Sequence, residues 1–269
     1  MTRRRKLIYC RYMAPTEKTH TPPPGIYPTI AVSQIKTPNR LYAFFLLGFL
    51  IKCIILIPQF FEIIILGIVY FILSIINSLV VLFTGKYWDT AYNFILGFLR
   101  FEAKVYFFFI GLTDTYPGFD FSLPDGIQVN IAKPTNPSRF FAFPIIGGLT
   151  RIILMIPYGI YTTVIHHAAW IGVVFSSFPV LFSGKYPEST YELARDSQRV
   201  ALASSAYMSG FSDKYPSFWI SMNHQTIKII LIILGALAAF GNFSADMTPK
   251  TIDDRQFQYQ HVPADTTNY

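Results

Sequence analysis

Charge is scarce in this chain of 269 residues: Asp, Glu, Lys and Arg together make up 14% of it, whereas 52% is apolar. The stretch Leu41–Phe83 holds only two charged residues, Lys52 and Glu62. A soluble domain of this size needs a larger charged surface, so the composition argues against an ordinary globular enzyme. A long apolar run of this kind is typical of a membrane protein.

Other features that define common classes are also missing. There are two cysteines, Cys10 and Cys53, so a framework of disulfides is not expected. The chain has no phosphate-binding glycine loop, no dinucleotide motif, no Gly-x-Ser-x-Gly and no zinc-ligand spacing. His166 and His167 are adjacent and point about 100° apart on a helix, so they favour helix packing over a metal site. We therefore expect no enzyme activity, cofactor or metal.

The strongest positive signal is a tandem duplication. Arg40–Phe121 recurs without insertion or deletion as Arg139–Ile220, 99 residues later. The motif LFTGKYWDTAY that begins at Leu82 aligns with LFSGKYPESTY that begins at Leu181. The shared residues are mainly turn residues and charged residues, while the apolar residues between them vary. This is expected where a position in contact with lipid requires an apolar side chain but no particular one.

Each repeat begins with an apolar stretch that is too long for one crossing. Pro58, and Pro157 in the second copy, disfavour helix at the residue before them. We therefore predict a break there, with a first helix near 40–57, a second near 59–83 and a left-handed cap at Gly85. The predicted fold is an all-α membrane protein: two tandem repeats of a helical hairpin plus an amphipathic helix, and an extra C-terminal transmembrane helix.

The third segment of each repeat, near 88–112 and 188–211, is amphipathic. One interpretation places both helices in the headgroup plane, with the charged stripe in water. The other packs them inside the bundle, where Glu102 and Asp196 would be counter-ions of Arg100 and Arg199. The first is favoured, with Arg100 deeper than Arg199 because its helix is more apolar, so that Arg199→Gln should be the milder change.

An apolar run at 227–243 follows the second repeat and gives five predicted spans. Before each repeat, Ile30, Val32 and Ile35, and then Ile127, Val129 and Ile131, alternate with polar residues. These segments are either short strands or unstructured linkers. Strands that pair with each other would have to emerge on one face, which favours parallel over inverted copies.

The chain is accordingly divided into six parts. They are a disordered basic tail with a short strand (1–39), a first membrane repeat (40–121), a linker with a short strand (122–138), a second repeat (139–220), a transmembrane helix (221–243) and a disordered acidic tail (244–269). The basic cluster Arg3–Lys6 is interpreted as a topology signal or lipid contact, not a nucleic-acid site. The five spans predict a multi-pass protein of the cell membrane. The basic cluster predicts a cytoplasmic N-terminus, which places the C-terminus outside.

Six cations recur at matched positions and are the candidate structural, lipid or partner contacts. They are Lys52 and Arg151, Lys86 and Lys185, and Arg100 and Arg199. Lys52 and Arg151 each lie in the middle of an apolar segment, which indicates either an interfacial helix or an interior ion pair. Lys86 and Lys185 follow a helix-ending glycine and complement the negative end of the helix dipole.

An Ile-Pro in a long apolar stretch, then LF[TS]GKY[WP], an amphipathic helix with a central Arg, and [TS]D-x-YP-x-F together resemble a family. It is the bacterial membrane family catalogued as domain of unknown function 4389, often found as two tandem copies. The family usually has His after the Ile-Pro, where this chain has Gln59 and Tyr158, and Arg where it has Lys86 and Lys185. The resemblance implies an architecture and no activity.

Two functions remain open on these grounds. The first is a non-catalytic scaffold or accessory subunit that binds membrane lipids or other membrane protein subunits. The alternative is a small transporter or channel built from the duplicated unit. A conduit needs polar groups at matched depth in both copies, and only the Lys52/Arg151 and Arg100/Arg199 pairs qualify.

Overall fold

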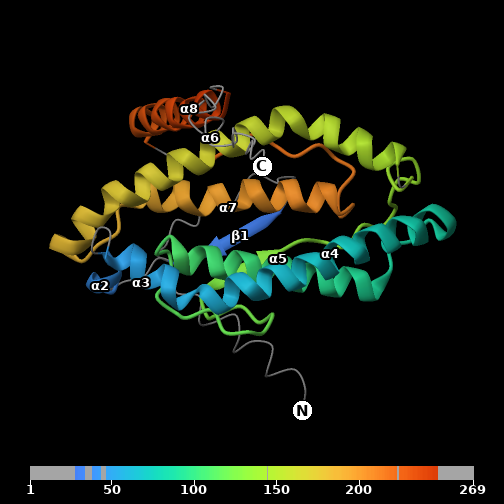
Figure 1. Cartoon of the computed structure of the whole chain (residues 1–269), viewed down its shortest axis with the longest axis horizontal. Coiled ribbons are helices and arrows are strands. Elements are labelled where there is room, and N and C mark those ends of the chain that lie inside the picture. The colour runs from blue at the N-terminus through green and yellow to red at the C-terminus, as the bar shows by residue number, and fades with distance from the viewer. Residues whose placement is uncertain (1–27, 34–37, 44–46, 144, 223, 248–269) are drawn as a thin grey trace, which may run out of the picture.

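The structure is a computed structural model that describes the chain except residues 1–27, 34–37, 44–46, 144, 223 and 248–269. It is mainly helical, with one small sheet (Figure 1). The elements in chain order are β1 (Thr29–Val32), α2 (Arg40–Ala43), α3 (Leu47–Ile55), α4 (Ile57–Thr84), α5 (Asp89–Phe109), β2 (Ile127–Asn130), α6 (Ile146–Ser183), α7 (Glu188–Met208) and α8 (Gln225–Met247).

The predicted helical hairpin is wrong. In the second copy α6 runs through Pro157 as one helix of 38 residues, and in the first copy α3 and α4 are separated only by Leu56 (Figure 1). Pro58 stands in the first turn of α4, where the missing N–H has no helical partner to lose. Pro58 therefore removes little hydrogen bonding, whereas Pro157 removes one helical N–H inside α6, and no turn residues follow either proline to reverse the chain. Each repeat has one long helix instead of two.

The remaining helix predictions agree with the structure. Gly85 ends α4 with φ +70° and Gly184 ends α6 with φ +68°, the left-handed conformation that favours glycine. The two amphipathic segments form α5 and α7, and the last apolar run forms α8. The predicted boundaries differ from the observed ones by only a few residues.

The long helices lie side by side in the order α4, α5, α7, α6 and α8 (Figure 1). Along the long axis of the molecule, α4 runs from left to right and α6 from right to left. The amphipathic helices α5 and α7 therefore occupy the middle of the layer, and the apolar helices α4 and α6 flank them. The copies are related by an approximate two-fold rotation.

Both predicted strands are present, and they pair with each other antiparallel; Ile35, predicted in the first strand, lies outside the described residues. Ile30 and Val32 in β1 and Ile127 and Val129 in β2 turn one buried face toward the helices, while the alternate residues are exposed. The strand before the first repeat packs on α7 of the second, and the strand before the second packs on α5 of the first. Each strand has thus crossed to the other copy.

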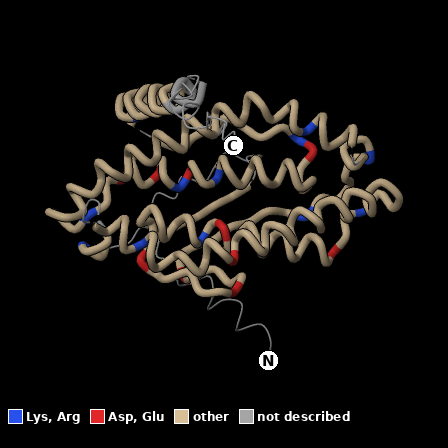
Figure 2. The backbone as a smooth tube through the Cα atoms, in the orientation of Figure 1, with Lys and Arg blue, Asp and Glu red and all other residues tan. Residues whose placement is uncertain are grey.

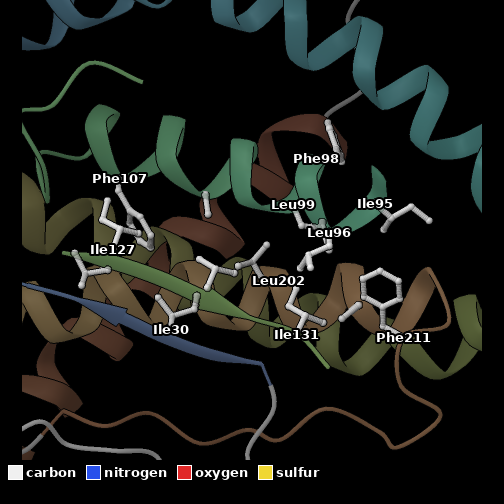
Figure 3. Close-up of a cluster of buried hydrophobic side chains, with 14 of the residues drawn as sticks. Ile30, Ile95, Leu96, Phe98, Leu99, Phe107, Ile127, Ile131, Leu202 and Phe211 are labelled. Carbon is white, nitrogen blue, oxygen red and sulfur yellow. The ribbon is translucent and has the colours of Figure 1, made fainter. Parts of the chain in front are cut away.

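The central core lies where α5, α7 and the sheet meet (Figure 3). In Figure 3, Leu96 and Leu99 of α5 point toward the strands, and Leu202 of α7 reaches the same place. Tyrosine hydroxyls tie the crossed strands down: Tyr191 donates to Val32 O at 2.6 Å and Tyr92 donates to Ile131 O at 2.8 Å. These two hydrogen bonds are related by the 99-residue repeat.

A second pair of exchanged contacts joins the ends of the layer. The guanidinium of Arg139, at the start of the second repeat, lies so close to Gly85 that a Cβ there would be 3.0 Å from Nη2. Arg40 approaches Gly184 in the same way, at 3.6 Å. Each arginine thus complements the carboxyl end of the long helix in the other copy. The sequence prediction had assigned that role to Lys86 and Lys185.

The C-terminal helix α8 packs on α6 and has no equivalent in the first copy. The two helices approach closely at Gly235, because a Cβ there would lie 2.6 Å from the Val164 carbonyl oxygen. Small residues of this kind let two apolar helices approach closely.

Two helices of the described chain, α4 and α6, are long and apolar enough to cross a membrane, and Gln225–Gly241 is a shorter apolar helix. The prediction of five spans required two crossings per repeat. It is wrong because the predicted hairpins are absent from the described residues. The predicted disordered tails lie largely outside the described residues.

Candidate functional site

A buried cation and an aspartate line the same cavity in both copies. Lys52 and Arg151 are 4% and 5% exposed, and Arg151 forms an ion pair with Asp213, whereas no ion pair among the described residues includes Lys52. The aspartates come from the turn that follows the amphipathic helix: Asp114 accepts a hydrogen bond from Asn39 N, and Asp213 accepts one from Ser138 N, both at 2.7 Å. Each aspartate therefore connects the end of its repeat to the beginning.

Each of these pairs lines a cavity, and the two cavities are related by the 99-residue repeat. Tyr42, Lys52 and Asp114 line the first, and their equivalents Phe141, Arg151 and Asp213 line the second. The opposite wall comes from the long helix of the other copy, α6 for the first cavity and α4 for the second. Both cavities are therefore formed between the repeats.

The second cavity is almost filled, with a volume of about 60 Å³. The Arg151 guanidinium donates to Tyr207 O, to Ser212 O at 3.2 Å and to Asp213 Oδ1 at 2.5 Å. It also lies 4.8 Å from the centre of the Phe141 ring and 4.9 Å from that of Tyr207. These contacts hold the charge in a fixed position.

The first cavity is open, with a volume of about 600 Å³. Among the described residues, Lys52 Nζ has one hydrogen bond, to Phe109 O at 3.4 Å, and it lies 5.5 Å from the centre of the Tyr42 ring. Of the ion pairs among the described residues, none includes Lys52. The ammonium group of Lys52 therefore differs from the Arg151 guanidinium in lacking a carboxylate within ion-pair distance among the described residues.

The far part of the first cavity is aromatic and apolar. The rings of Phe49, Phe109 and Trp170 pack on one another with centroid separations of 5.2 to 6.1 Å. Phe49 and Val174 also belong to the exposed apolar surface of the molecule. The cavity therefore joins a charged inner end to a mouth on the apolar surface.

Arg100 and Arg199 contradict the interfacial interpretation of the amphipathic helices, since α5 and α7 are the most buried of the long helices. Arg199 is 2% exposed, donates to Trp219 O and lies 3.8 Å from Asp196, as the interior alternative predicted. Arg100 is only half-buried and donates to Val129 O at 3.3 Å. The depth order is the reverse of the predicted one, because buried polar partners, and not helix apolarity, set it.

Glu102 is not the partner of Arg100. Two residues apart on a helix, their side chains do not face each other, and none of the ion pairs among the described residues includes Glu102. Burial raises the pKa of its carboxyl above the usual range. Lys86 and Lys185 are exposed at the turns, and their role as lipid contacts stays a prediction.

The residue after the Ile-Pro has a role that sequence reasoning did not find. Gln59 is fully buried and donates to the Tyr116 hydroxyl, while its equivalent Tyr158 packs edge-to-face on Tyr215 with ring centroids 6.0 Å apart. Tyr116 and Tyr215 are the tyrosines of the [TS]D-x-YP-x-F motif. The signal was present in the repeat alignment, which joins the two motifs in both copies.

Lys104, which is buried in α5, also has a role that sequence reasoning did not find. It donates to Asp120 Oδ1 at 2.9 Å, to Asp120 O and to Ser122 O at 3.2 Å, in the segment that follows α5. The hydrogen bond from Ser122 and those from Lys104 lower the pKa of Asp120 to about 2. This contact holds the segment over α5, where Phe121 lies against Gly97.

Comparison with protein families decides the relationship suggested by the motifs. A family model described as Domain of unknown function (DUF4389) matches residues 47–120 and 148–220. The chain belongs to this family. The two matched segments are the two repeats of the structure, so the DUF4389 unit consists of one long apolar helix, one amphipathic helix and the turn that carries the aspartate. No curated protein and no solved structure matches the chain.

Proposed function

We propose that this DUF4389 protein is a non-catalytic integral membrane protein, a scaffold or accessory subunit that binds lipid along α4, α6 and α8. The observation that supports this most strongly is the surface of α4. Only Gln59, Asn77 and Val81 of its 28 residues are buried, and its outward side chains are predominantly Ile, Leu and Phe.

The distribution of charge supports the same proposal. Glu62 is the single charged residue of α4, and Arg151 is the single one of α6. Figure 2 shows charged residues concentrated on α5, on α7 and in the connecting segments. A protein partner would be expected to meet a polar rim around an apolar patch, whereas acyl chains require an uninterrupted apolar surface. Lipid is therefore the favoured occupant.

The experiment is extraction of membranes that contain the full chain. We expect the protein to stay in the membrane pellet in alkaline carbonate and to be released only by detergent. Release by carbonate or high salt would contradict membrane integration. The transporter alternative is tested in the same purified material, because a conduit would produce solute or ion flux in proteoliposomes and a scaffold would not.

Multi-pass insertion with a cytoplasmic N-terminus is the topology proposed from the basic cluster Arg3–Lys6. Since α4 and α6 run in opposite directions, crossing by both would invert the copies with respect to the membrane (Figure 1). It would also bring the exposed polar face of the sheet to the depth of the hydrocarbon, where open strand edges are not tolerated without cover.

Gln128, on that exposed face of β2, distinguishes the two arrangements. In a variant with both cysteines replaced by serine, Gln128→Cys should resist an impermeant maleimide if the helices cross and a partner covers the sheet. Rapid labelling of intact vesicles would instead show that the layer of helices lies in the plane of the membrane, with the sheet facing water.

A further inference from the structure

The open cavity of the first copy is a site that the family assignment does not explain. We propose that it binds a single-chain zwitterionic phospholipid, with the phosphate at Lys52, the headgroup ammonium at Asp114 and the acyl chain against Phe49, Phe109 and Trp170. This inference rests on the proposed lipid contact of the protein and goes further by naming one site and one ligand class.

The charges of the cavity select the headgroup. Lys52 and Asp114 both line it, yet they do not form the ion pair that Arg151 and Asp213 form in the second copy. A ligand with only a negative charge would be attracted by Lys52 and repelled by Asp114. A ligand with only a positive charge would be attracted by Asp114 and repelled by Lys52. A zwitterion places an opposite charge beside each group and adds no net charge to a poorly solvated site.

The apolar part of the cavity selects the chain. Its volume of about 600 Å³ falls within the ~300 to 1,000 Å³ that is usual for small-molecule sites. Phe49 and Val174 line the cavity and are also exposed on the apolar surface, so that an acyl chain can enter from surrounding lipid without crossing water. The proposed ligand has one acyl chain because one aromatic cluster, Phe49, Phe109 and Trp170, lines the apolar part of the cavity.

The second copy shows what closes such a site. The guanidinium of Arg151 reaches Tyr207 O and Ser212 O, which are the equivalents of Phe108 O and Thr113 O in the first copy. Arginine at position 52 should reach the corresponding carbonyl groups and Asp114, and so occupy the space where the headgroup would lie. Lys52→Arg keeps the charge and is therefore a selective way to fill the cavity.

Native mass spectrometry of the full chain, released from a non-ionic detergent, measures the ligand directly. With palmitoyl lysophosphatidylethanolamine as the probe, we expect one retained molecule per chain. Palmitate and hexadecylammonium, which carry the same chain length and a single charge, should be retained at least about tenfold less. Equal retention of palmitate, or two retained probe molecules per chain, would overturn the proposal.

Variants assign the binding to this cavity. Lys52→Arg should reduce retention at least about tenfold, and the matched change Lys214→Arg, at an exposed position, should leave it unchanged. Val174→Trp narrows the mouth without touching either charge and should also reduce retention, which keeps the test valid if Lys52→Arg unfolds. Full retention by both cavity variants would refute the site, whereas carbonate extraction tests membrane integration separately.

Discussion

Ile30 and Val129 pair with each other in the β1–β2 ladder, and they are the same position of the two repeats. A residue can pair with its own equivalent only at a two-fold axis, so the approximate axis of the molecule passes between them. The two cavities and the paired tyrosine hydrogen bonds are related by this axis. Differences between equivalent residues can therefore be tested as matched pairs.

The tyrosines that hold the crossed strands form the first matched pair. Tyr191→Phe should cost about 1 to 3 kcal/mol, because the hydroxyl is buried and Val32 O loses its donor. Tyr92→Phe should cost about 0.5 to 1.5 kcal/mol, since Tyr92 is only half-buried. Thermal unfolding in detergent measures both, with Tyr215→Phe as the control, and an equal loss in all three would contradict the assignment.

The aspartates of the two cavities should differ in the same direction. Asp213→Asn leaves the buried Arg151 without its ion pair and should cost about 3 kcal/mol, the low end for a buried pair because Asp213 is 26% exposed. Asp114→Asn should cost less than about 1 kcal/mol, since its amide oxygen can still accept from Asn39 N. A larger loss of melting temperature for Asp114→Asn would show that Lys52 depends on that carboxylate.

Arg199 and Arg100 provide a test of the corrected depth order. Arg199→Gln removes a buried cation from Asp196 and Trp219 O and should cost about 3 kcal/mol, because Asp196 keeps its contacts with Arg195 and Ser221. Arg100→Gln, which loses a single long hydrogen bond, should cost about 1 kcal/mol. The melting temperatures of the two purified variants decide the order, and the milder outcome for Arg199→Gln would restore the interfacial interpretation.

The Lys104–Asp120 contact should make stability depend on pH. The pKa of Asp120 is about 2 in the folded chain against an ordinary value of 3.8, so the stability it contributes is present above pH 3.8 and is lost as pH falls through 2. Wild type should therefore melt at a higher temperature than Asp120→Asn at pH 5, and the difference should disappear toward pH 2. Asp125→Asn is the control, and a difference that persisted at pH 2 would exclude the ion pair as its cause.

Local patterns predicted the elements well and their long-range contacts poorly. The repeat, the alternation at Ile30 and Val129, and the capping glycines are visible in the chain itself, and all appear in the structure. The hairpin failed because Pro58 lies in the first turn of α4 and Pro157 is accommodated inside α6, so neither proline reverses the chain. Arg40 and Arg139 could not be assigned from sequence, since each acts on the helix end of the other copy.

For the candidate site, too, the sequence predicted the residues but not their long-range contacts. Lys52 and Arg151 were found because a buried charge stands out in an apolar segment, and their equivalence followed from the repeat. That one cavity is open and the other filled depends on how far a side chain reaches, which neither periodicity nor composition records. The burial of Arg199 was missed because its cover, the segment that carries Trp219, is not amphipathic.

Because the strands are exchanged between the copies, the association of two such units would depend on concentration if the units were separate chains. A lone unit of this kind would have to find a second chain to cover its core, and its folding would weaken on dilution. Joining two units end to end replaces that encounter with an intramolecular one at a fixed effective concentration. Symmetry is then no longer required for assembly, so one copy can fill its cavity with Arg151 for rigidity while the other keeps Lys52 and an open space for a ligand.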